Sequence, residues 1–306
     1  MNDTAISVTP LRASARTLLN GAIDYAGLFP PSQLSMADAV TNYALNRASV
    51  HSWMLGRFVV PAARLAEFRE HAEPYVANPG RSPWHLSVLA GEDVYESIKT
   101  IVDFNRDNAG QVIADSFEVR ASTPSKIENT VDALPDWLIA YFELPIDAPH
   151  FAELISTVAV NKQRAKIRTG GVTADAFPRS RDVIRFVRTC TAANVPFKAT
   201  AGLHHPIRCF KPLTYEPDAP QGTMHGFLNL FLMTAFARQS FPPGLLEELM
   251  EEEFEEAFSF SDTHVAWRDH ELALWQLERT RRFGIQSFGS CSFEEPVEDL
   301  KALGLL

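Results

Sequence analysis

The sequence has few cysteines and no long apolar segment. Its three cysteines, Cys190, Cys209 and Cys291, are widely spaced and form no CxxC pair. Such a set favours free thiols in a reducing compartment over a disulfide framework. The longest apolar run, residues 226–237, contains Asn229 and is too short to cross a bilayer. Residues 1–19 lack the apolar core of a signal peptide. We therefore expect a cytoplasmic protein with no membrane partner.

Positive charge is scarce as well. The chain has 28 Lys and Arg against 38 Asp and Glu, a formal net charge of −10. Seven of the acids fall within residues 247–256, so the remainder is only mildly acidic. Proteins that bind the phosphate backbone usually present a basic face. We therefore expect no nucleic-acid partner.

The composition is otherwise that of an ordinary globular protein. Hydrophobic residues make up 46% of the chain and charged residues 22%, which excludes disordered, collagen-like and coiled-coil classes. A (β/α)₈ barrel needs about 250 residues. The 306 residues are therefore enough for one such barrel with an insertion.

Short apolar runs of strand length alternate repeatedly with helical patterns. The expected strands are residues 22–28, 53–60, 85–89, 114–120, 137–144, 165–169, 196–201 and 285–290. The expected helices between and after them are residues 36–47, 62–71, 94–105, from 125 onward, 149–158, 180–193 and 296–303. Eight strand–helix units predict a single TIM (β/α)₈ barrel domain over residues 1–306.

The alternation breaks once, between the seventh and eighth expected strands. Residues 203–284 contain an apolar helical pattern at 227–238, an acidic one at 247–256 and a third at 267–282. We interpret this segment as a helical insertion in the last βα loop. It would leave the barrel at the face that carries the chemistry of such folds, as a lid or as a subunit contact for a homo-oligomer.

Charged residues alternate with apolar ones along several expected strands. Lys166 and Arg168 share one strand face, and Lys198, Thr200 and Gly202 share a face of the next strand. The other charged residues with this alternation are Asp24, Glu118, Arg120 and Glu143. In a barrel the apolar face meets the helices, so the charged face lines the interior. Three acids and four bases form a nearly neutral set, as a shared polar pocket requires.

Two neighbouring lysines have a specific chemical use. A lysine must lose its proton before it can attack a carbonyl carbon, and its usual pKa near 10.4 prevents this at neutral pH. A second ammonium group nearby and partial desolvation favour that loss. The amine then forms a Schiff base, which withdraws electrons and permits cleavage or formation of a carbon–carbon bond. This chemistry needs no metal or cofactor, and we expect none.

The motifs around these lysines resemble those of deoxyribose-phosphate aldolase and its class I aldolase relatives. Residues 166–170, Lys-Ile-Arg-Thr-Gly, resemble the family's KTSTG-type motif, and residues 198–202, Lys-Ala-Thr-Ala-Gly, resemble its KxSGG-type motif. Residues 289–292, Gly-Ser-Cys-Ser, are similar to its phosphate-binding turn. Further similarity covers residues 23–28 and 56–64, and the family's acid in the fourth strand falls on Glu118.

The resemblance implies a role for each of these residues. Lys166 would be the imine-forming nucleophile and Lys198 its neighbour that lowers the pKa, while Glu118 and Asp24 would move protons. The expected substrate-binding residues are Glu143, Arg168, Thr169, Gly170, Gly171, Thr200, Gly202, His204, Gly289 and Ser290. Arg168 replaces a small hydroxyl residue of the family, and would bind a substrate carboxylate or phosphate or pair with Glu143.

We therefore expect a class I aldolase-like lyase acting on a small, anionic aldehyde or ketone. Because the chain departs from the family at Arg168 and in the insertion, we do not expect deoxyribose 5-phosphate itself to be the substrate. The glycine turns after the last three strands would donate backbone N–H groups to an anion, or merely allow tight turns.

Two other classes of function remain open. His204, His205, Cys209 and His225 form the densest group of metal-binding residue types, with Asp262, His264 and His270 as a second group. These residues would suit a metal-dependent barrel hydrolase, although their spacing fits no established metal motif. A catalytically degenerate barrel that serves as a binding or scaffold protein is the other alternative.

Overall fold

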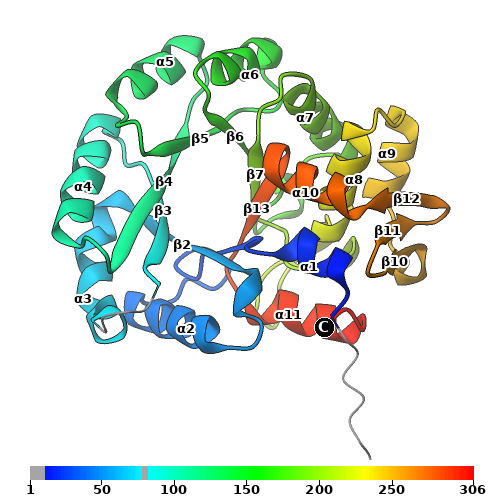
Figure 1. The fold of residues 1–306 in the computed structure, drawn as a ribbon, viewed down its shortest axis with the longest axis horizontal. Helices are drawn as coiled ribbons and strands as arrows, with labels where there is room; N and C mark the ends of the chain where they lie inside the picture. Colours follow the sequence, from blue (N-terminus) through cyan, green and yellow to red (C-terminus); the bar gives the residue numbers. More distant parts are fainter. Residues whose placement is uncertain (1–10, 78–81) are drawn as a thin grey trace, which may run out of the picture.

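A closed, all-parallel barrel of eight strands forms the centre of the molecule (Figure 1). The computed structural model describes residues 11–77 and 82–306. The expectation that residues 1–19 contain no signal peptide therefore falls partly on residues 1–10, which lie outside the described part. The barrel strands are β1 (Ile23–Tyr25), β2 (Leu55–Pro61), β3 (Trp84–Leu89), β4 (Val112–Arg120), β5 (Ile139–Glu143), β6 (Arg164–Arg168), β7 (Phe197–Thr200) and β13 (Ile285–Ser290). All eight lie within or beside the predicted ranges, and the predicted (β/α)₈ fold is confirmed.

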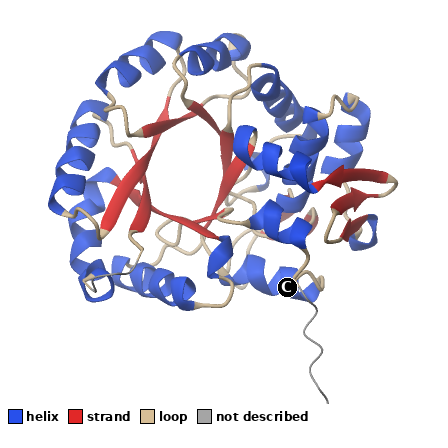
Figure 2. Ribbon diagram, in the orientation of Figure 1, coloured by secondary structure: helices blue, strands red, loops and turns tan. Residues whose placement is uncertain are grey.

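Helices surround the barrel on its outer side (Figure 2). They are α1 (Ala13–Leu19), α2 (Met36–Ala48), α3 (Leu65–Val76), α4 (Val94–Asp107), α5 (Pro124–Ala133), α6 (Phe151–Val160), α7 (Ser180–Ala192), α8 (Phe227–Arg238), α9 (Pro243–Met250), α10 (Leu274–Phe283) and α11 (Glu294–Ala302). Side-chain caps begin several of them; Ser35 accepts from Asp38 N at 3.1 Å and Asp93 from Glu96 N at 3.0 Å.

Apolar residues of the barrel strands face this helical layer. Phe117, Ile167, Phe197 and Ala199 are fully buried, and each alternates with a polar residue that faces the interior. The predicted separation of the two strand faces is therefore correct, and it directs the ionisable side chains into the barrel.

The insertion between β7 and β13 is only partly helical. The helix predicted at 227–238 is α8, whose residues are buried on every side, as an apolar helix of this kind requires. Two small antiparallel sheets were not predicted. One pairs β8 (Cys209–Pro212) with β9 (Gln221–Met224), and the other contains β10 (Phe258–Phe260), β11 (His264–Trp267) and β12 (His270–Ala273). Figure 1 shows the latter sheet beside α8 and α10, outside the barrel.

Two helix predictions within the insertion were wrong in their extent. The helix expected at 267–282 begins only at Leu274, because Trp267 pairs with His270 across a two-residue turn in which Arg268 has φ = 50°. The acidic helix expected at 247–256 ends at Met250. Beyond it the carboxylate of Glu252 turns inward and accepts from Trp267 Nε1 at 3.2 Å.

Within residues 11–77 and 82–306, no helix combines the length and apolar character that crossing a membrane would require.

Candidate active site

Lys166 and Lys198 lie directly opposite each other on the adjacent parallel strands β6 and β7. Both side chains extend into the barrel interior, where only 4% and 2% of their surfaces are exposed. Burying two ammonium groups is costly unless each has a negatively charged partner. The surrounding strands supply those partners.

Glu118 of β4 binds both lysines at once. Its Oε2 lies 2.7 Å from Lys166 Nζ, and its Oε1 lies 2.5 Å from Lys198 Nζ. Burial alone would raise the pKa of Glu118, but the two ammonium groups hold it well below its usual range. The sequence predicts two lysines that repel each other directly; instead, a shared carboxylate lies between their charges.

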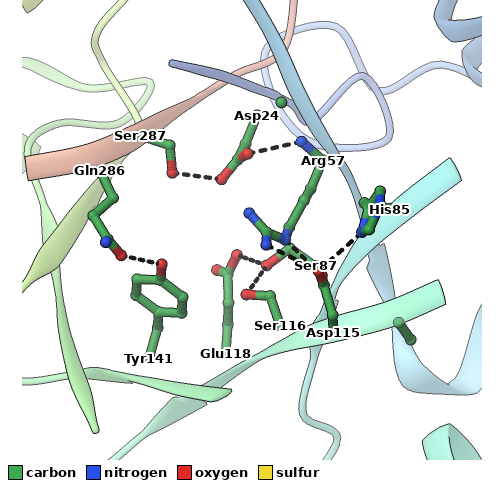
Figure 3. Close-up of polar contacts among 12 residues, drawn as sticks. Asp24, Arg57, His85, Ser87, Asp115, Ser116, Glu118, Tyr141, Gln286 and Ser287 are labelled. Atoms are coloured by element: carbon green, nitrogen blue, oxygen red, sulfur yellow. Dashed lines mark hydrogen bonds and ion pairs between the residues drawn. The ribbon is translucent and has the colours of Figure 1, made fainter. Parts of the chain in front are cut away.

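Lys198 has a second carboxylate, Asp24 of β1, whose Oδ2 lies 2.8 Å from Nζ. Although burial alone would lower the pKa of Lys198, Asp24 and Glu118 raise it well above its usual range. The Asp24 carboxylate also accepts from Ser287 Oγ at 2.8 Å and from Arg57 N at 2.9 Å (Figure 3). Lys198 is therefore a fixed cation at neutral pH.

Two serines complete these contacts and were not singled out from the sequence. Ser87 of β3 donates to Glu118 Oε1 at 2.6 Å and accepts from Lys198 Nζ at 3.1 Å, and Ser287 of β13 donates to Asp24. In the sequence, only their positions in the alternation of the expected strands could have indicated that these two serines face the barrel interior. Figure 3 shows both serines directed toward the carboxylates.

Glu143 of β5 is the second partner of Lys166, with Oε2 at 2.7 Å from Nζ. Its other oxygen lies 3.3 Å from Arg120 and 3.4 Å from Arg168, so three cations surround one carboxylate. Burial alone would raise the pKa of Glu143, but Lys166 and then the arginines lower it. The predicted pairing of Arg168 with Glu143 is present.

A further, partly exposed ionic group contains Asp115 of β4. The register of β3 with β4 shifts so that Ser87 pairs with Ser116, which leaves Asp115 as an additional residue in β4. Asp115 binds Arg57 Nε at 2.7 Å and His85 Nδ1 at 2.9 Å (Figure 3). This bulge allows both Asp115 and Ser116 to contact polar partners.

A cavity of about 270 Å³ opens above the lysines. Of the residues expected in the site, those that line it are Glu118, Lys166, Arg168, Gly171, Lys198, Thr200, His204 and Gly289. Glu118, Lys166 and Lys198 lie within β4, β6 and β7, whereas Arg168, Gly171, Thr200 and His204 lie at or beyond the carboxyl ends of β6 and β7. The cavity therefore opens at the end of the barrel where such folds carry their chemistry.

The other expected residues do not line this cavity. Asp24 lies behind Lys198, Glu143 lies behind Lys166, and Ser290 is buried. Thr169 donates its hydroxyl to Ala201 O at 2.7 Å. A Cβ on Gly170 would lie 2.9 Å from Gly202 Cα, and Gly202 has φ = 73°, so both glycines have a packing role.

The nearest polar partner differs among the three histidines of the metal alternative. His204 Nδ1 lies 3.0 Å from Glu295, His205 Nδ1 lies 2.6 Å from Asp299, and His225 Nε2 lies 2.8 Å from Pro178 O. Within the described ranges, no three His, Cys, Asp or Glu side chains are arranged so that they could hold one metal ion.

The fold and the cavity define a (β/α)₈ barrel with an ionised, lysine-containing pocket at the carboxyl ends of its strands. Comparisons of the chain with family models, curated proteins and solved structures found no match to any of them.

Proposed function

We propose that the protein is a class I aldolase-like lyase in which Lys166 forms a Schiff base with a small, anionic aldehyde or ketone. The observation that supports this most is the position of Lys166. Its amine lines the cavity and touches two carboxylates, Glu118 and Glu143. A nucleophile that must lose a proton is thus in direct contact with groups that can accept one.

The reaction begins with proton transfer from Lys166 to Glu143 as the substrate enters. Nζ then attacks the carbonyl carbon, the oxygen takes one proton from Nζ and one from Glu143 and leaves as water, and an iminium ion remains. The iminium draws in the electron pair of the neighbouring carbon–carbon bond and becomes an enamine, while a carboxylate acting through a water molecule removes the proton of the hydroxyl on the far carbon of that bond, whose oxygen becomes the carbonyl of the departing aldehyde. Protonation of the enamine carbon and hydrolysis of the resulting iminium then restore the free Lys166. Glu118 suits the role of this carboxylate, since it lines the cavity and bonds to both lysines.

The charge around Glu143 favours an anionic substrate. Lys166, Arg120 and Arg168 share this one carboxylate. Arg120 and Arg168 also line a second surface pocket together with Lys126. The positive charge that Glu143 does not balance would attract a carboxylate or phosphate group, and a guanidinium can bind either in a bidentate manner.

Reductive trapping tests this proposal. The protein is incubated with small aldehydes and keto acids in the presence of borohydride, and any adduct is located by peptide mass spectrometry. We expect an adduct on Lys166 and none with Lys166→Met, a variant in which Glu118 keeps Lys198 and Glu143 keeps its arginines. Tight stoichiometric zinc binding without any adduct would contradict the proposal and favour the hydrolase.

A second variant tests the role of Lys198. Removal of its fixed positive charge should favour the protonated form of Lys166. We therefore expect Lys198→Met to trap less adduct at neutral pH and to recover part of it at high pH. Trapping that is unaffected by pH in this variant would contradict the proposed role.

A further inference from the structure

Cys291 lies in the same cavity as the two lysines, just after β13, and only 5% of its surface is exposed. Two polar side chains contact its sulfur. His204 Nδ1, from the loop after β7, lies 3.9 Å from Sγ, and Tyr215 Oη, from the loop between β8 and β9, lies 3.6 Å from it. Three segments distant in the sequence therefore meet at one thiol.

Glu295 of α11 orients both contacts. Its Oε2 lies 3.0 Å from His204 Nδ1 and accepts from Tyr215 Oη at 3.1 Å. Its own position is supported by the bond from Glu295 N to Ser292 Oγ at 3.1 Å. Glu295 Oε2 and Cys291 Sγ both contact the same ring nitrogen, Nδ1, so the proton on this nitrogen is shared between a carboxylate and a thiolate. A thiol beside an imidazole that a carboxylate keeps protonated has the components of an activated cysteine nucleophile.

The charges around Cys291 support the same interpretation. Burial alone would raise the pKa of Cys291, but His204, Ser32 and Tyr215 lower it. Burial alone would lower the pKa of His204, yet Cys291 and Glu295 raise it to about 9. Tyr25, another titratable group near the sulfur, keeps its proton at neutral pH, since burial raises its pKa.

The other two cysteines differ in these respects. Cys190 is buried within α7, and burial raises its pKa well above the usual range. Cys209 at the start of β8 is more exposed than Cys291, but desolvation raises its pKa to about 11. Cys209 therefore provides an internal control that is more accessible and less activated.

We propose that Cys291 and His204 form a second nucleophilic centre of the cavity, which adds reversibly to an aldehyde. The thiolate forms a carbon–sulfur bond, and the π electron pair of the carbonyl moves to its oxygen. That oxygen takes the proton of the His204 imidazolium, and the product is a neutral thiohemiacetal beside a neutral imidazole. The step needs no oxidant and does not depend on Lys166 forming an imine.

Competitive alkylation tests the nucleophile. The protein is treated with limiting iodoacetamide at pH 7, and labelling of each cysteine is followed by peptide mass spectrometry. We expect Cys291 to react at least about tenfold faster than the more exposed Cys209, because a larger fraction of it is thiolate. Faster labelling of Cys209 would overturn the proposal.

The pH dependence of labelling tests the partner. His204→Asn should slow labelling of Cys291 at pH 7 by about tenfold or more and move its midpoint toward the ordinary thiol value near 8.5. Tyr215→Phe, a change at a half-exposed side chain, should move the midpoint in the same direction by a smaller amount. An unchanged midpoint in both variants would contradict a role for the cluster.

Acetaldehyde serves as the probe for the substrate class. It should slow iodoacetamide labelling of Cys291 but not of Cys209, and should do so equally in Lys166→Met. Protection that disappears in Lys166→Met would mean that an imine merely blocks the cavity, and absence of protection in the wild type would also overturn the proposal. Because the Lys166→Met variant cannot form that imine, this result is separate from the lyase test.

Discussion

At the scale of single residues, Glu118 connects the two lysines of the pocket. One carboxylate neutralises parts of two ammonium charges and holds them on either side of itself. In low-dielectric surroundings this arrangement stabilises the charged forms of all three groups, because each would be costly to bury alone. In the proposed lyase reaction, the proton transfer from Lys166 to Glu143 would therefore accompany substrate binding.

Gly56 of β2 illustrates how closely the interior is packed around these charges. A Cβ on Gly56 would lie 2.4 Å from Asp24 Oδ1, so only glycine leaves room for this carboxylate beside Lys198. We expect Gly56→Ala to displace Asp24 and to lower the free energy of unfolding by about 1–3 kcal/mol, as for other overpacked cores. Urea unfolding measures the loss.

Gly244 of α9 supplies the matched control, since a Cβ there would have no atom within 4 Å. Gly244→Ala should change the free energy of unfolding by less than about 0.5 kcal/mol or increase it slightly. Equal losses in the two variants would show that contact with Asp24 is not the cause.

Among the structural elements, α8 joins the insertion to the barrel. Phe227 stacks on Phe288 of β13 with ring centroids 4.8 Å apart. The buried Asn229 Nδ2 donates to Leu249 O at 2.8 Å and to Glu252 O at 2.9 Å. Its Oδ1 accepts from Arg208 N at 3.0 Å. One amide thus satisfies backbone groups of α9, of the segment that follows α9 and of the segment that leads to β8.

Asn229→Leu should destabilise the protein because it leaves these three backbone groups buried without their partner. We expect a loss of at least about 2 kcal/mol in the free energy of unfolding, from about 1–3 kcal/mol per unsatisfied group. Thr234 is also fully buried in α8, and its hydroxyl donates only to Leu230 O within the same helix, so Thr234→Val removes a single bond. This control should lose less than about 1 kcal/mol, and comparable losses would contradict the proposed role of Asn229.

In the molecule as a whole, paired carboxylates link stability to pH. Glu118, Glu143 and Asp115 have lowered pKa values, and that of Asp115 is about 2 because His85 and Arg57 outweigh the effect of burial. Such groups bind protons more weakly in the folded state than in the unfolded state. Their stabilisation is therefore fully present above the unfolded pKa near 4 and is lost as the pH falls through the folded value.

We expect the free energy of unfolding to decrease from about pH 5 to about pH 2. Asp115→Asn should cost about 2 kcal/mol at pH 7, and its difference from the wild type should disappear near pH 2. The exposed Asp136→Asn serves as the control and should follow the wild-type curve. Denaturant unfolding at a series of pH values measures this, and a difference that persists at pH 2 would contradict it.

The sequence was sufficient for the barrel and for the direction of its charged side chains. Eight apolar runs of period two, separated by helical segments, leave few topologies other than a closed parallel barrel. Alternation along β6 and β7 alone placed Lys166 and Lys198 on the inner face. Insertion sheets such as β11 with β12 were missed, because a two-residue turn at Arg268 interrupts a pattern that also suits a helix.

Only the tertiary structure decided which groups share each charge. Glu118 contacts both lysines because of the register between neighbouring strands. Asp24 contacts Lys198 because β1 closes the barrel against β13, which in turn pairs with β7. Likewise, Cys291, His204 and Tyr215 meet only where loops from distant segments pack at the cavity. Alternation is a local property that a sequence contains, whereas distances between side chains depend on register, closure and packing, which arise from the whole chain.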